Sequence, residues 1–230
     1  MKKKIIVLLV LALILQNLHG LEIQSTGEEL GFYFTPEFNR SLNFCWALST
    51  VGAVTFQEMY TAKGGLALGG SGDVFDMKLF AGADVALPIG IPLFVGLSYN
   101  YYGLPKYEAH THSLLPLVSL NYPRAGVSLG HTFRFTRFFG ESPVFEPVFS
   151  FSAYVNFINK EKLLLGLKGA NFSEFNYGNF GSYFFNLYSA VSLSEKLSLI
   201  NEIELHQGGS VALSANFYGV VFRGGVLFSW

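Results

Sequence analysis

Three ionisable residues near the end of the chain, Glu202, Glu204 and His206, alternate with apolar residues. In an extended strand this spacing places all three side chains on one face. Two carboxylates and an imidazole could bind a metal ion or transfer protons. The ordinary polarity of one strand face explains the same row more simply, so we predict no metal or catalytic site there.

Other patterns that could carry chemistry are weaker. His110 and His112 form an H-x-H pair that could bind Zn²⁺ or Cu²⁺, but no further ligand is evident beside them. The glycine-rich stretch 68–73 resembles a phosphate loop, yet neither a lysine nor a helix follows it, so we predict a turn. Cys45 is the single cysteine, which excludes an internal disulfide. We predict no cofactor and no bound metal.

One residue, His131, could take part in the active site of a lipid-modifying enzyme. His131 lies close in sequence to Ser128 and Thr132. Neighbouring residues of a strand point to opposite faces, so His131 and Thr132 would not meet. The sequence contains no convincing arrangement of serine, histidine and acid, and we predict that the protein is not an enzyme.

Residues 1–20 have the three parts of a secretory signal peptide: basic Lys2–Lys4, apolar Ile5–Leu15 and a polar exit ending at Gly20. The apolar part is shorter than the about 20 residues that a spanning helix needs. We therefore predict a cleaved signal peptide, 1–20, and one mature domain, 21–230. The chain carries a formal net charge of −1, and removal of the three lysines makes it more acidic, which argues against nucleic-acid binding.

The chain is rich in apolar residues, but polar residues interrupt its apolar runs. Half of the residues are hydrophobic (50%) and only 13% are charged, against about 25% in an ordinary soluble domain. After residue 20 no apolar run approaches the length of a membrane helix. A closed β-barrel satisfies every backbone hydrogen bond between its strands and can present an apolar exterior to lipid. These observations predict an all-β fold: a single transmembrane, up-and-down, antiparallel barrel.

Apolar and polar residues alternate through most of the mature chain, as barrel strands require. We count about twelve strands, and merging segments near the N-terminus would leave about eight or about ten. The predicted strands are 30–38, 42–56, 61–70, 73–87, 92–103, 113–121, 125–138, 144–158, 162–174, 181–193, 197–206 and 211–230. Short turns at 88–92, 121–124, 159–162 and 194–196 would lie at one end, and connections at 105–113, 140–143, 176–181 and 207–210 at the other.

The charged residues decide which face points inward. A lysine or arginine facing lipid at the bilayer midplane costs about 2–4 kcal/mol, so the polar faces should surround the lumen. The predicted lumen lining is Asp76, Lys78, Asp84, Arg134, Lys162, Lys168, Glu202, Glu204, His206 and Arg223. Three polar residues, His131, Arg137 and Asn201, fall on the apolar face instead, and Arg137 lies near a rim where it could reach a lipid head group.

The chain ends in an alternating apolar strand. Val220, Phe222, Val226, Phe228 and Trp230 share one face, with Gly224 in the remaining position. Residues 211–217 have the opposite phase, which indicates either a β-bulge near Tyr218–Gly219 or a turn there. A turn would exchange the two ends of the barrel, and we favour the bulge.

The signal peptide, the alternating strands and this last strand together resemble bacterial outer-membrane β-barrel proteins of the porin-like kind. The resemblance implies that the last strand is read by the barrel-assembly machinery. It also implies periplasmic chaperones as partners during biogenesis and outer-membrane lipids as the final surroundings. The expected function is a small passive channel for polar solutes. The alternatives are a non-conducting barrel whose surface loops bind a ligand or host molecule, and a structural role in the membrane.

Overall fold

The computed structural model describes residues 25–39, 44–175, 182–208 and 216–230. The predicted signal peptide, the predicted connection 176–181, residues 209–210 of the predicted connection 207–210 and residues 211–215 of the predicted strand 211–230 lie outside these residues. The described chain forms twelve strands and one short 3-10 helix, η1. The strands are β1 Ser25–Asn39, β2 Phe44–Phe56, β3 Tyr60–Ser71, β4 Val74–Ala86, β5 Leu93–Leu104, β6 Ala109–Asn121, β7 Ala125–Arg137, β8 Val144–Lys160, β9 Leu163–Ala170, β10 Ser182–Ser194, β11 Leu197–Gly208 and β12 Asn216–Ser229; η1 spans Pro105–Tyr107.

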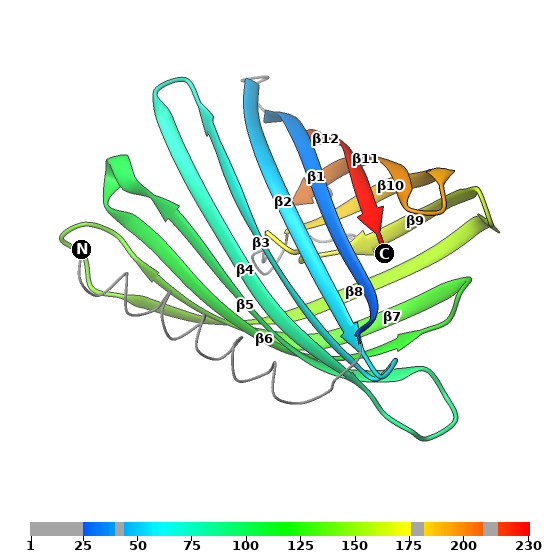
Figure 1. Cartoon of the computed structure of the whole chain (residues 1–230). Helices are drawn as coiled ribbons and strands as arrows, with labels where there is room; N and C mark the ends of the chain where they lie inside the picture. Colours follow the sequence, from blue (N-terminus) through cyan, green and yellow to red (C-terminus); the bar gives the residue numbers. More distant parts are fainter. Residues whose placement is uncertain (1–24, 40–43, 176–181, 209–215) are drawn as a thin grey trace.

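The strands form one closed antiparallel wall (Figure 1). Each strand pairs with its neighbours in the sequence, and β1 pairs with β12 to close the ring. At this seam Glu28 and Trp230 exchange two backbone hydrogen bonds of 3.0 Å. The prediction of an up-and-down barrel with twelve strands is therefore confirmed. No helix in the described part of the chain is long and apolar enough to cross a membrane.

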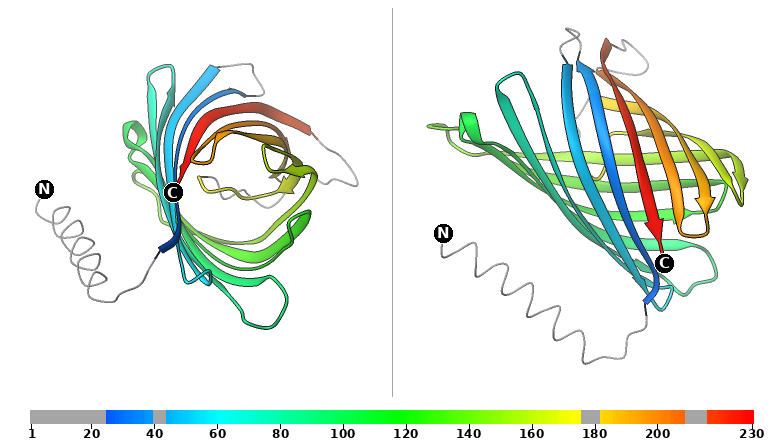
Figure 2. Two further views of the ribbon diagram at one scale, coloured as in Figure 1. Left: turned by 45° about the vertical axis from the view of Figure 1, so that its right-hand side comes forward. Right: turned by 45° about the horizontal axis from the view of Figure 1, so that its top comes forward.

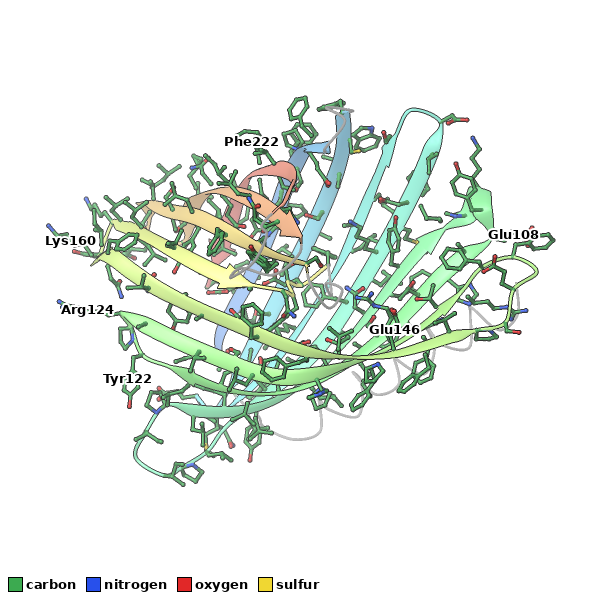
Figure 3. All side chains as sticks on the ribbon, turned by 180° about the vertical axis from the view of Figure 1, so that it is seen from behind. Glu108, Tyr122, Arg124, Glu146, Lys160 and Phe222 are labelled. Atoms are coloured by element: carbon green, nitrogen blue, oxygen red, sulfur yellow. The ribbon has the colours of Figure 1, made fainter. Side chains whose placement is uncertain are left out.

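The start of β1 and the end of β12 lie together, at an end that we call the terminal end; the other is the distal end. The connections 57–59, 87–92, 122–124, 161–162 and 195–196 are at the terminal end, and those after β3, β5 and β7 are at the distal end. Figure 3 shows Tyr122, Arg124 and Lys160 at the terminal end and Glu108 at the distal end. This arrangement agrees with the order of turns expected from the sequence.

Apolar side chains cover the outside of the wall. The even-numbered Phe32, Phe34 and Phe38 of β1 are exposed, and so are the odd-numbered Val95, Leu97 and Tyr99 of β5. Phe222 and Phe228 of β12 and the following Trp230 are exposed, whereas Val221 is buried. Phe222 points away from the barrel in Figure 3. The alternation read from the sequence therefore corresponds to the outer and inner faces of the wall.

The phase change in the last strand is a bulge. His206 pairs with Gly219 and Gln207 pairs with Phe217, so Tyr218 is an extra residue in β12. One unpaired residue shifts the side-chain alternation by one position without ending the strand. Because the chain makes no turn here, the two ends of the barrel remain as predicted.

Two predicted segments differ from the structure. The predicted connection 105–113 is short, because β5 runs to Leu104 and β6 begins at Ala109. The predicted strand 162–174 is also shorter: β9 spans Leu163–Ala170, and the following residues leave the wall. Pro116 coincides with a gap in one ladder, since β6 pairs with β7 at Leu114 and Leu117 but at neither residue between them. Pro36 and Pro147 are paired with Trp46 and Phe133.

Candidate functional site

The predicted lumen residues come from five strands. Asp76, Lys78 and Asp84 are on β4, Arg134 on β7 and Lys168 on β9; Glu202, Glu204 and His206 are on β11, and Arg223 is on β12. All nine belong to the set that alternates with the exposed apolar residues of its strand. Lys162 differs, because it lies in the exposed turn between β8 and β9. The turn takes up residues 161–162, so this lysine is at the terminal end and not on a strand face.

A compact polar cluster covers the inner face of β10, β11 and β12. The Arg223 Nη1 atom lies 3.1 Å from Glu202 Oε2, and its Nη2 atom lies 4.0 Å from Glu204 Oε1. Asn186 Nδ2 donates to Glu202 Oε2 at 3.0 Å, and His206 Nε2 lies 2.9 Å from Glu204 Oε2. Glu202 and Arg223 are direct cross-strand partners. Glu202, Glu204 and His206 therefore all make side-chain contacts within the wall.

A second ion pair lies across the barrel, on β3 and β4. Lys63 Nζ is 2.7 Å from Asp84 Oδ2. The position opposite Asp84 on β5 is Gly96, where an added Cβ would come within 2.0 Å of Asp84 Oδ1. The missing side chain leaves room for the carboxylate to lie across β5. Lys63 is not in the predicted lumen lining, because apolar and polar residues alternate only weakly in its segment 61–70.

Two further contacts involve the basic residues Arg134 and Lys78. Arg134 Nη1 on β7 lies 3.6 Å from Glu146 Oε2 on β8, and Arg134 is buried while Glu146 is exposed. Figure 3 labels Glu146 on its strand. Lys78 Nζ lies 5.5 Å from the centre of the Tyr102 ring, a distance at which cation–π attraction operates.

The chain after β9 turns into the lumen, and we call residues 171–175 the crossing segment (Figure 2). Asn171 begins it. The side chain of Asn171 donates to Phe149 O at 2.7 Å and accepts from Phe151 N at 2.8 Å, both on β8. Its backbone N–H also donates to Phe151 O at 3.1 Å. These three bonds hold the start of the segment against the wall.

The rest of the crossing segment reaches the opposite side of the barrel. Phe172 packs on the buried pair Leu115 and Leu117 of β6. The backbone carbonyl of Glu174 accepts a 2.9 Å hydrogen bond from Asn100 Nδ2 of β5. Phe175 meets Phe80 of β4 edge to face, with ring centres 5.1 Å apart. The segment therefore contacts β8, β6, β5 and β4 in turn.

The wall provides a seat for the tip of this segment. Phe175 and Phe80 belong to a buried cluster with Ala67 of β3. A Cβ added at Gly65 would lie 3.1 Å from the Phe175 ring and 2.5 Å from Thr50 O. Only a residue without a side chain leaves this space for Phe175 while keeping the backbone of β2 and β3 paired.

A cavity of about 610 Å³ lies beside the crossing segment. Its wall combines hydroxyl and amide side chains, the Lys63–Asp84 pair, Lys168, Glu174 and several aromatic rings. The lining residues include Ser98, Ser119, Asn121, Ser128, Ser152, Asn156, Phe80, Phe94, Phe172, Tyr154 and Tyr188. Glu174 is accessible from this space and interacts electrostatically with Lys168, Arg223 and Lys63. Of the predicted lumen residues, Asp84 and Lys168 line the cavity directly.

The arrangement offers little for metal or acid–base chemistry. Within the described ranges, no group of three or more His, Cys, Asp or Glu residues could hold a metal ion. His131 is exposed on the outer face and lies against Phe133 and Phe149, whereas Thr132 is buried and bonded to Ser150. His131 and Thr132 therefore point apart, as the sequence indicated. The absence of enzymatic activity remains a prediction.

Known structures share this architecture. The translocator domain of the autotransporter NalP from Neisseria meningitidis superposes with a TM-score of 0.54 at 15% identity, covering 91% of each chain. The chain has the fold of the bacterial outer-membrane β-barrels. The NanC porin gives a TM-score of 0.57 at 8% identity, covering 86% of this chain and 98% of that one. The KdgM porin, solved in complex with disordered oligogalacturonate, gives 0.56 at 9% identity, covering 87% and 99%.

These likenesses establish the fold alone, because the identities are low. No protein family matches the sequence, and no curated protein matches it.

Proposed function

We propose that this barrel is a passive channel for small polar solutes in the outer membrane, narrowed by the crossing segment. The observation that carries the proposal is the cavity of about 610 Å³ beside that segment. Its hydroxyl, amide and charged side chains can replace the hydrogen bonds that a polar solute makes with water. The likeness to porins supports the same reading, since those barrels extend over nearly the same length of chain.

The proposal includes the membrane in which the barrel lies and the way in which the chain reaches it. The apolar outer face suits a lipid bilayer, and the fold suits the outer membrane. Residues 1–20 would direct export. Barrels of this kind have short periplasmic turns and longer external connections, so the terminal end would face the periplasm and the distal end the outside. The outward face of β12, which ends at Trp230, would be recognised by the assembly machinery.

A second candidate is a folded barrel that does not conduct. The crossing segment favours it, because Phe172 packs on β6 and Phe175 packs on β3 and β4, so that the two rings fill part of the lumen. Binding by a long loop at 105–113 is less favoured, since only Pro105 to Glu108 separate β5 from β6.

Permeation of small solutes distinguishes the two candidates. Liposomes containing the folded barrel should swell in isotonic solutions of a pentose faster than in a trisaccharide, because the crossing segment limits the size of the passage. Protein-free liposomes provide the baseline. Swelling at the baseline rate, with the barrel shown to be folded by its heat-dependent gel migration, would refute the channel and leave the non-conducting barrel.

A further inference from the structure

The outer wall carries a polar patch near the distal end. His110 and His112 belong to β6, in phase with the exposed residues Leu114 and Val118, so their side chains face outward. Ser113 between them and Leu114 is buried on the inner side. The H-x-H pair, which the sequence placed in a connection, is therefore part of the apolar outer face. Polar side chains are unusual on a surface that faces lipid.

Neighbouring strands extend this patch. His112 lies between Tyr101 of β5 and Phe135 of β7, and His110 lies between Gly103 and Arg137. Tyr99 Oη is 2.7 Å from His112 Nδ1. The ring centres of His110 and His112 are 5.3 Å apart, as are those of Tyr101 and His112. We call Tyr99, Tyr101, His110, His112 and Arg137 the distal outer patch.

The patch consists of hydrogen-bond donors and one fixed positive charge. On the outer faces of the described strands, it is the one place where an arginine adjoins imidazoles. Glu108 and Glu141 lie in the adjoining connections, yet in the described chain neither forms an ion pair with Arg137. A charge at this depth costs about 0–1 kcal/mol, far less than at the midplane, which suits the level of the lipid head groups.

An aromatic strip lies directly below the patch. Along β7, Arg137 is followed toward the midplane by the outward residues Phe135 and Phe133, about 7 Å apart from one to the next. Phe145 of β8 stacks on Phe133 at 6.4 Å with an interplanar angle of 4° and lies 4.8 Å from Phe135. The polar side chains at the rim therefore adjoin a flat apolar surface on the side toward the midplane.

We propose that the distal outer patch binds the phosphate of a lipid head group, with an acyl chain of the same lipid on the aromatic strip. The planar guanidinium of Arg137 can donate two parallel hydrogen bonds to a phosphate. When the Tyr99 hydroxyl donates to His112 Nδ1, the ring proton is on Nε2, which is then a further donor. The inference is independent of conduction and requires only that the barrel lies in a bilayer.

Native mass spectrometry of the detergent-solubilised barrel tests this site. Three probes separate the possible sources of affinity: didodecanoyl phosphatidic acid, didodecanoylglycerol and inorganic phosphate. We expect phosphatidic acid to bind at least about tenfold more tightly than the diacylglycerol, a difference of about 1.4 kcal/mol. Inorganic phosphate should not displace it at equal concentration. Equal retention of both lipids, or ready displacement by phosphate, would overturn the proposal of a lipid site.

Substitutions test whether the residues of the distal outer patch bind the lipid. In the triple variant Arg137→Gln, His110→Gln, His112→Gln the preference for phosphatidic acid should fall to about that of the diacylglycerol. The control is Lys160→Gln, which removes an exposed cation at the terminal end and should leave the preference unchanged. If the triple variant does not fold, Arg137→Gln alone should still reduce the preference several-fold.

A preference that survives these substitutions, or that is lost equally in the control, would refute the patch as the site. The same would follow if Zn²⁺ bound in a His110-dependent way and phosphatidic acid binding were insensitive to all three residues.

Discussion

At the residue scale, hydroxyl pairs link neighbouring strands on the inner face. Ser119 donates to Ser128 at 2.8 Å, and the hydroxyls of Thr132 and Ser150 are 2.6 Å apart. The second pair is among the most buried in the described barrel, with Thr132 1% and Ser150 2% exposed. A polar atom at such a position must have a partner, since water cannot reach it.

Replacing Thr132 by valine should therefore destabilise the barrel. The substitution keeps the shape. Ser150 Oγ still donates to Val148 O at 3.3 Å but loses the hydrogen bond that it can accept from Thr132, and a buried acceptor left without its donor costs about 1–3 kcal/mol. Urea unfolding of the barrel in lipid vesicles, followed by tryptophan fluorescence, measures the loss. The double variant Thr132→Val, Ser150→Ala removes both hydroxyls and should recover part of the stability. Equal or greater loss in the double variant would contradict this account.

One exposed ion pair joins two distal connections. Asp73 follows β3, Lys106 lies in η1, and their side chains form a hydrogen-bonded ion pair. The hydrogen bond and charge of Lys106 lower the pKa of Asp73 below its ordinary value, and the same bond with Asp73 raises the pKa of Lys106. The pair is complete at neutral pH. Its contribution is present above the ordinary Asp pKa and is lost as the pH falls through the lowered value.

Lys106→Gln should consequently move the pKa of Asp73 upward toward that of a free aspartate. NMR titration of the Asp73 carboxyl measures this shift directly. Glu141→Gln, in a different distal connection, is a matched control that should leave the titration of Asp73 in place. An unchanged Asp73 pKa in Lys106→Gln would show that the ion pair is not formed in solution.

At the element scale, the strands could be predicted because side-chain alternation is a local property. The bulge at Tyr218 was visible for the same reason, as a change of phase within one strand. The crossing segment was not, although Phe172 falls on the opposite face from Leu163, Leu165 and Leu167, so the apolar phase changes where the chain leaves the wall. Whether a phenylalanine faces lipid or a lumen cluster depends on distant partners such as Leu115 and Phe80, which the local pattern does not contain.

His110 and His112 differ from the prediction in the other direction, because they were expected in a connection and lie in a strand. The stretch 105–113 is predicted to be a connection because it begins with a proline, which is typical of turns. In the structure Ala109 to Ser113 pair with β5, and the first two strand partners are Leu104–Ala109 and Gly103–His110. Backbone pairing with a long neighbouring strand outweighs the weak preference of polar residues for turns.

The anchor of the crossing segment can be tested with one residue. Asn171→Ala removes the side-chain hydrogen bonds to Phe149 and Phe151, so amide hydrogen exchange should rise across 171–175. Mass spectrometry measures the amide hydrogen exchange of this segment, and β9, which should stay protected, is the internal reference. Asn159→Ala, which removes a bond to Pro123 at the terminal end, is the matched control. Unchanged protection in Asn171→Ala would mean that Asn171 does not hold the segment.

At the scale of the whole molecule, the lumen charges were predicted only in part. Alternation found the charges on the strongly patterned strands. It missed Lys63 and Glu174, which lie on a weak strand and on the crossing segment. With these included, acidic side chains outnumber basic ones on the inner side of the described residues. The acidic set is Glu29, Glu37, Asp76, Asp84, Glu146, Glu174, Glu202 and Glu204, and the basic set is Lys63, Lys78, Arg134, Lys168 and Arg223.

A conducting barrel with this lumen should prefer cations weakly. The reversal potential under a KCl gradient should indicate more K⁺ than Cl⁻ permeation at about 0.1 M salt. The preference should shrink at about 1 M, where the Debye length falls from about 10 Å to about 3 Å. Glu174→Gln should reduce the preference, and Glu141→Gln, in a distal connection, should not. A preference for anions would contradict the charge distribution.

Single-channel recording in planar bilayers tests the central claim most directly. The folded barrel should give discrete conductance steps. Cys45, the single cysteine, alternates with the outward residues Phe44 and Trp46 and therefore faces the lumen side of β2. A charged thiol-reactive reagent should lower the conductance of the unaltered barrel and leave Cys45→Ser unaffected. A correctly folded barrel that stays silent, or steps that are unchanged after Cys45 has been labelled, would contradict a passage through this lumen.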